Sequence, residues 1–155
     1  MVDRIDAQPG PAPPGPAGAP APLRAVPERR VYAWRFPLTN ASVPAVRHAV
    51  RPFVARAGVP DDEAEDLVLA TCEAAANVVD HARASTQAYF DVTFESSGDD
   101  VVIMVRDHGR WQAGRTPFGA EGRGLKMMMS LAAVTLTSGP EGTTVTLRSK
   151  RSLPS

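Results

Sequence analysis

The sequence contains one cysteine, Cys72, few aromatic residues, no excess of either charge and no long apolar run. A single cysteine cannot form a disulfide within the chain, which favours a reducing compartment. Seventeen basic residues balance 17 acidic ones, which argues against a dedicated nucleic-acid binder and gives no support for an anionic membrane partner. The sequence also lacks a membrane span and the pattern of a secretory signal. We therefore expect a cytoplasmic protein with no direct nucleic-acid or membrane partner.

Proline, alanine and glycine dominate residues 8–27. Such a segment buries too little apolar surface to offset the entropy lost on ordering. We therefore expect residues 1–28 to form a disordered linker-like tail, although a PxxP-type ligand has the same composition. Residues 29–148 are expected to make one domain, in keeping with the chain length of 155 residues. Residues 149–155 are expected to form a flexible end.

The spacing of apolar residues predicts the element order β-α-α-β-β-loop-α-β-β. Strands are expected over residues 31–36, 88–95, 101–105, 134–137 and 143–147, and helices from Ser42, from Asp61 or Asp62 to about Ala82, and over 125–132. Short turns between neighbouring strands indicate a mixed, mostly antiparallel sheet with the helices stacked on one face. The predicted fold class is α+β, a two-layer sandwich.

Three local expectations accompany this order. Residues 101–105 form a continuous apolar run, typical of a central strand covered on both faces. Pro52 is expected to kink or end the first helix, because it cannot donate a helical hydrogen bond. Asp61 or Asp62 is expected to cap the second helix.

The second helix carries an apolar stripe beside a polar one. The apolar stripe holds Leu67, Thr71, Ala74 and Val78, and the polar stripe holds Asp66, Glu73, Asn77 and Asp80. Glu73 and Asn77 stand four residues apart, so their side chains project to one place. The amide oxygen of Asn77 is a hard ligand suited to Mg²⁺, and the carboxylate of Glu73 could accept a proton from an attacking hydroxyl. An ordinary solvated helix face is the alternative.

The motif Asp107-His108-Gly109 follows directly after a predicted strand. A carboxylate there can accept a hydrogen bond from an exocyclic amine such as that of adenine, and Gly109 lets the backbone approach the ring. A common turn has the same pattern. The dipeptide Gly142-Thr143, which opens the last strand, is by itself also only a turn.

Glycines 119, 122 and 124 lie where a loop enters the third helix. Their free N–H groups and the helix dipole suit phosphate groups, although a flexible glycine loop would look the same. Leu125 stands where a P-loop needs lysine, and no strand directly precedes the loop. A Rossmann fingerprint is excluded because its third glycine is missing.

Taken in order, these motifs resemble those of the GHKL ATP-binding fold shared by gyrase, histidine kinases and MutL-type ATPases. The text from Glu73-Ala-Ala-Ala-Asn77 to His81-Ala82 is similar to that of the anti-sigma factor serine/threonine kinases. The resemblance covers roughly residues 30–148. It implies that Asn77 binds the Mg²⁺ that bridges the ATP phosphates and that Glu73 is the catalytic base.

The resemblance also assigns the remaining motifs. It implies that Asp107 holds the adenine amine with Gly109 beside it, and that Thr143 helps to recognise adenine. Gly122 and Gly124 would flank the phosphates in a lid, with Arg123 and Leu125 beside them. Either Arg115 or Arg123 would contact the γ-phosphate.

The sequence departs from the family pattern in the adenine box and in the lid. Trp111 stands where the box has its second glycine, so its ring would stack on a base or crowd the adenine pocket. The lid from Arg110 to Glu121 is short. His48, His81, His108 and Cys72 have no metal-ligand spacing, so no zinc site is predicted.

The function expected from the resemblance is an ATP- and Mg²⁺-dependent serine/threonine kinase that acts as an anti-sigma factor. It would phosphorylate an anti-anti-sigma partner, bind a sigma factor and form a homodimer. The main alternative is a binding module of the same fold that sequesters a regulator with weak or no nucleotide binding. A third possibility is the ATPase half of a split sensor kinase.

Overall fold

The computed structural model describes residues 28–81, 87–98, 100–109 and 123–150. Several features named from the sequence lie outside these residues. They are the predicted tail as far as residue 27, Ala82, the lid from Arg110 to Glu121 with Arg115 and Trp111, Gly122, and residues 151–155 of the predicted flexible end.

The described residues form the elements in the predicted order. They are β1 (Arg29–Pro37), α1 (Ser42–Arg56), α2 (Asp61–Asp80), β2 (Tyr89–Ser97), β3 (Asp100–Arg106), α3 (Arg123–Leu131), β4 (Ala133–Gly139) and β5 (Gly142–Arg148). Within the described ranges, none of the helices has both the length and the apolar character needed to cross a membrane.

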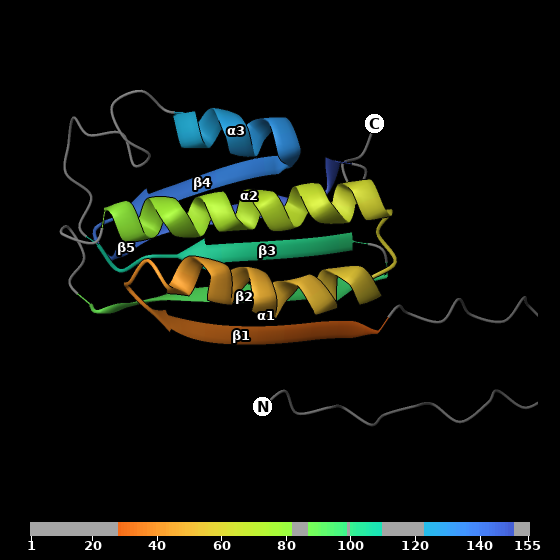
Figure 1. The fold of residues 1–155 in the computed structure, drawn as a ribbon, viewed down its shortest axis with the longest axis horizontal. Helices are drawn as coiled ribbons and strands as arrows, with labels where there is room; N and C mark the ends of the chain where they lie inside the picture. The colour runs from red at the N-terminus through yellow and green to blue at the C-terminus, as the bar shows by residue number, and fades with distance from the viewer. Residues whose placement is uncertain (1–27, 82–86, 99, 110–122, 151–155) are drawn as a thin grey trace, which may run out of the picture.

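The strands make one five-stranded sheet in the order β1-β2-β3-β5-β4. All four pairings are antiparallel. In Figure 1 the helices lie on one side of this sheet, with α1 over β1 and β2, α2 over β3 and β5, and α3 beside β4. The predicted two-layer α+β fold is therefore confirmed.

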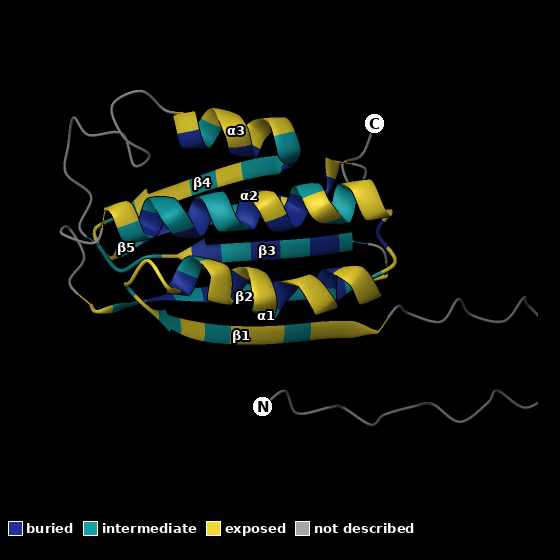
Figure 2. Cartoon of the chain, in the orientation of Figure 1, coloured by how far each residue is buried: buried dark blue, intermediate teal, exposed yellow. Residues whose placement is uncertain are grey.

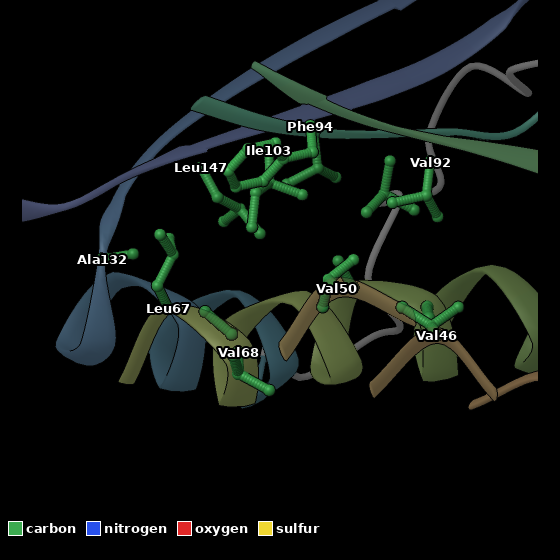
Figure 3. Close-up of a cluster of buried hydrophobic side chains, with 14 of the residues drawn as sticks. Val46, Val50, Leu67, Val68, Val92, Phe94, Ile103, Ala132 and Leu147 are labelled. Atoms are coloured by element: carbon green, nitrogen blue, oxygen red, sulfur yellow. The ribbon is translucent and has the colours of Figure 1, made fainter. Parts of the chain in front are cut away.

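The hydrophobic core lies between the helices and the sheet. Every second residue of β2, β3 and β5 is buried, as expected for strands with one covered face. Figure 3 shows side chains of α1 and α2, among them Val50 and Leu67, pointing toward Phe94, Ile103 and Leu147 of the sheet. Figure 2 shows that the edge strands β1 and β4 contain only half-buried and exposed residues.

The expectation that residues 101–105 are covered on both faces is wrong. In β3, Val101, Ile103 and Val105 are fully buried, but Val102 and Met104 are only half-buried. The helices cover one face of the sheet, so the alternate residues of this apolar run face outward. An apolar run shows that a strand is central, but it does not show that a second layer is present.

Two expectations about helix boundaries are also corrected. α1 does not end at Pro52 but continues to Arg56, with Val50 and Val54 on either side of Pro52 buried in the core. The residue that caps α2 is Pro60, without a side-chain hydrogen bond. Asp61 and Asp62 lie instead in the first turn, where their charges interact favourably with the helix dipole.

Candidate functional site

The four sequence motifs lie at one end of the molecule. Figure 1 shows the carboxyl ends of α2 and β3 and the amino ends of α3 and β5 at the same end of the sandwich. Two contacts join them, because α2 packs against α3 and β3 pairs with β5. The antiparallel topology thus brings together segments that are about 70 residues apart in the sequence.

The contact between Asn77 and Gly124 defines the first half of the site. Asn77 is half-buried near the carboxyl end of α2, and Gly124 is buried in the first turn of α3. A Cβ atom at position 124 would lie 2.3 Å from Nδ2 of Asn77 and 2.9 Å from its Oδ1. Only glycine allows α3 to approach the Asn77 carboxamide so closely.

The side-chain amide nitrogen of Asn77 is a hydrogen-bond donor that a ligand could satisfy. Nδ2 is buried and has no hydrogen-bond partner among the described residues. A buried donor without a partner costs about 1–3 kcal/mol. A phosphate oxygen at the start of α3 would satisfy it, and the helix dipole there favours an anion.

The residues present also fit a magnesium ion that is bound partly by the protein and partly by phosphate oxygens or water. Oδ1 of Asn77 would supply an oxygen ligand, and the half-buried carboxylate of Glu73 lies one helical turn earlier on the same stripe. In the described ranges, no group of three His, Cys, Asp or Glu side chains could hold a metal by itself. A cation here would therefore need phosphate oxygens or water as further ligands, as Mg²⁺ commonly does.

Asp107 defines the second half of the site. Its Oδ1 accepts hydrogen bonds from the backbone N–H groups of Gly109 (3.1 Å) and Thr143 (2.9 Å). The Asp107 N–H donates in turn to the Thr143 carbonyl at 3.0 Å. These bonds hold the carboxylate at the joint between β3 and β5. Its other oxygen, Oδ2, has no partner in the described part of the chain and remains available to a donor on a ligand.

Gly142 is the site residue that the sequence analysis treated only as part of a turn. Its φ is 142°, and a Cβ there would lie 2.1 Å from the carbonyl oxygen of Asp107. The next residue, Thr143, is buried, and its Oγ1 lies 3.1 Å from Oγ of Ser138. The glycine directly before Thr143 marked a possible turn, but the sequence did not show that it would lie against Asp107.

The remaining predicted site residues occupy the first turn of α3. Arg123 is exposed at the start of the helix, and Leu125 is half-buried against the core. Arg123 therefore lies where a cation could contact a phosphate. The predicted residues fall into two groups, one around Asn77 and Gly124 and one around Asp107 and Thr143.

Comparison with known proteins supplies independent information on this arrangement. A model of the histidine kinase-like ATPase domain matches residues 36–149, which include both groups. No functionally curated protein matches the chain. Among solved structures, the chain is similar to the crystal structure of the RsbU and RsbW domains of Rv1364c from Mycobacterium tuberculosis, with 26% sequence identity and a TM-score of 0.62. That match covers 77% of this chain but 32% of the other, so this chain spans about a third of that length.

Proposed function

This chain belongs to the histidine kinase-like ATPase domain family, and on that basis we propose that it is an ATP- and Mg²⁺-dependent serine/threonine kinase that acts as an anti-sigma factor. It phosphorylates an anti-anti-sigma partner and binds a sigma factor, so that binding of one partner releases the other. The similarity to a structure of RsbU and RsbW domains supports this proposal. So does the resemblance of the α2 motif to the anti-sigma factor kinases.

One observation carries the nucleotide-binding part of the proposal. Nδ2 of Asn77 is buried without a hydrogen-bond partner in the described part of the chain, and it lies beside Gly124 at the amino end of α3. Asn77 of α2 offers a hydrogen-bond donor and an oxygen ligand close to the amino end of α3. This combination suits a chain of phosphates with a bound cation. A structural asparagine would instead be satisfied by the protein itself.

Each group of site residues then has a distinct role. Asp107 accepts a hydrogen bond from the adenine amine, with Gly109 and Thr143 holding its other oxygen. Arg123 and the N–H groups of the first turn of α3, up to Leu125, bind the phosphates, and Gly122, outside the described residues, is proposed to join them. Asn77 would hold Mg²⁺, which would supply positive charge near the phosphates.

Glu73 acts on the protein substrate. The hydroxyl oxygen of the substrate serine or threonine attacks the γ-phosphorus, and the bond from that phosphorus to the β–γ bridging oxygen breaks. ADP leaves with the electron pair, and the carboxylate of Glu73 accepts the hydroxyl proton. Proton transfer to a positioned base contributes about 10²- to 10⁴-fold to the rate.

Calorimetric titration of the full chain with ATP, with and without Mg²⁺, tests the binding step. We expect binding that strengthens with Mg²⁺ in the wild type and loses this dependence in Asn77→Ala. Absence of binding at millimolar ATP would leave only a protein that docks its partners.

Transfer of labelled phosphate to candidate anti-anti-sigma proteins tests the chemical step. Glu73→Gln should bind ATP as the wild type does and lose at least about 100-fold in transfer rate. Retained transfer in Glu73→Gln would remove the assignment of the base. Phosphate recovered on histidine rather than on serine or threonine would contradict the proposed reaction.

The second candidate function is a binding module that sequesters a transcription regulator. Trp111 favours it, because this ring replaces a glycine in the motif that otherwise surrounds the adenine. Trp111→Gly distinguishes the two functions. A kinase needs no such change to bind ATP, whereas a sequestering module gains ATP affinity only in the variant.

A further inference from the structure

A cluster of charged and aromatic side chains lies on the sheet face that the helices leave uncovered. We call it the Asp91 cluster, and it consists of Arg35, Tyr89, Asp91 and His108. Phe90 and Val92, the neighbours of Asp91 in β2, are fully buried under the helices, so Asp91 points to the opposite face.

Asp91 is the centre of this cluster. Its Oδ1 accepts a hydrogen bond from Nε of Arg35 at 2.9 Å, and its Oδ2 lies 3.0 Å from Nε2 of His108. The Arg35 guanidinium lies 3.8 Å from the centre of the Tyr89 ring, which in turn packs edge-on against His108 at 5.0 Å. The four side chains thus contact one another in a closed ring.

The Asp91 cluster is connected to the candidate site through the backbone. His108 is the middle residue of the turn from Asp107 to Gly109, and its side chain is 17% exposed. On the β5 side, Asp107 is bonded to Thr143 through both its carboxylate and its N–H. The same turn is therefore held by β5 through Asp107 and by β2 through His108.

We propose that His108 is a positioning residue, an inference that rests on the proposed function. Through its contact with Asp91 it fixes the turn from Asp107 to Gly109, so that the free oxygen of Asp107 faces the amine of the bound base. His108 itself touches neither nucleotide nor substrate. His108 affects which nucleobase the site prefers.

The charge state of Asp91 supports a persistent contact. Partial burial by itself raises the pKa of Asp91, but the hydrogen bonds from Arg35 and then from His108 lower it below the ordinary value. The carboxylate is therefore ionised at neutral pH, and hydrogen bonds to an ionised acceptor are stronger than those between neutral groups.

The test compares Mg-ATP with the Mg-triphosphate of purine riboside, which lacks the exocyclic amine, by calorimetry on the full chain. We expect the wild type to bind ATP about tenfold or more tightly, since a hydrogen bond to a charged group is at stake. His108→Ala and Asp91→Ala should lower this ratio at least about threefold. His108→Gln, which keeps a donor for Asp91, should retain most of it.

Glu95→Ala is the matched control. Glu95 also lies on β2, on the same uncovered face, and forms a 2.7 Å ion pair with a β1 arginine, Arg29. Its side chain is 29% exposed, against 26% for Asp91. It is remote from the turn at Asp107, so its removal should leave the ratio of the two affinities unchanged.

A second measurement needs no nucleotide. Amide hydrogen exchange of Gly109 and Thr143, whose N–H groups donate to Asp107, should become faster in His108→Ala than in Glu95→Ala. If the affinity ratios and the amide exchange were unchanged in His108→Ala and Asp91→Ala, the positioning role of His108 would be overturned, while the proposed function would stand. If the wild type bound neither nucleotide, the proposed function would fail together with it.

Discussion

Gly124 shows how the absence of one side chain determines how closely two helices can approach each other. Its position in α3 leaves 2.3 Å between an added Cβ and Nδ2 of Asn77, a distance that no real contact shows. The Asn77 carboxamide is therefore close to the amino end of α3 only because residue 124 is glycine. The geometry here depends on the absence of a side chain at position 124 as well as on the contacts that are made.

The first prediction at the residue scale concerns Gly124→Ala. The added methyl must displace either Asn77 or α3, so we expect at least a tenfold loss of Mg-ATP affinity and about 1–3 kcal/mol of stability. Calorimetry and urea unfolding measure the two effects. Gly139→Ala is the control, because a Cβ there meets nothing within 4 Å. Equal losses in both variants would contradict the contact with Asn77.

The second prediction concerns Asp91 and acid. Its pKa lies below the ordinary value of 3.8, because the hydrogen bonds from Arg35 and His108 outweigh the opposite effect of burial. A lowered pKa gives stability that is present above pH 3.8 and is lost as the pH falls through the folded-state pKa. Asp91→Asn should therefore be less stable than the wild type by about 1 kcal/mol at pH 7. Urea unfolding should show this gap narrowing as the pH falls below 3.8, and a gap independent of pH would contradict the ion pair.

Among the elements, α1 is attached to the edge of the sheet by aromatic rings. The Phe53 ring of α1 lies 4.4 Å from that of Tyr32, 5.2 Å from that of Trp34 and 5.8 Å from that of Phe94. The three partners come from β1 and β2, so a single side chain connects the helix to both strands. In the described sheet β1 is an edge strand that pairs only with β2, so this packing gives it a second attachment, on the helix face.

The third prediction follows from this packing. Phe53→Ala should destabilise the protein by about 2 kcal/mol, less than for a fully buried ring because Phe53 is half-buried. In a Trp111→Phe background, the emission of Trp34 should shift to longer wavelength as its surroundings become wetter. Leu69→Ala, which removes a 40% exposed side chain from α2, should change stability by less than about 0.5 kcal/mol. Similar losses in the two variants would contradict the proposed role of the ring.

The elements were predictable where periodicity is decisive. The apolar stripe of α2 and the alternation in β2 identified the two elements, because each has one buried face. The apolar run over residues 101–105 gave the wrong prediction that both faces of this strand are covered. A strand covered on one face and a strand covered on both can have the same composition. The approach of Gly142 to Asp107 was not predictable, because it depends on the pairing of strands 35 residues apart.

For the whole molecule, ligand binding and folding are linked. A ligand that binds only the folded state stabilises it by about 2.7 kcal/mol at 100 times its Kd. The fourth prediction is therefore that saturating Mg-ATP raises the Tm of the wild type by several degrees. Asn77→Ala should show no such rise. A rise of equal size in that variant would show that the nucleotide binds away from α2.

The joint between β3 and β5 has a consequence for changes in the length of the chain that connects them. β3 and β5 pair directly and Asp107 bonds to Thr143 across their joint, although residues 110–122, α3 and β4 lie between them in the sequence. The sheet register therefore does not depend on how many residues intervene, and lengthening a loop costs little entropy. Insertions or deletions between residues 109 and 123 should therefore change the length of this connection while the strand pairing stays constant.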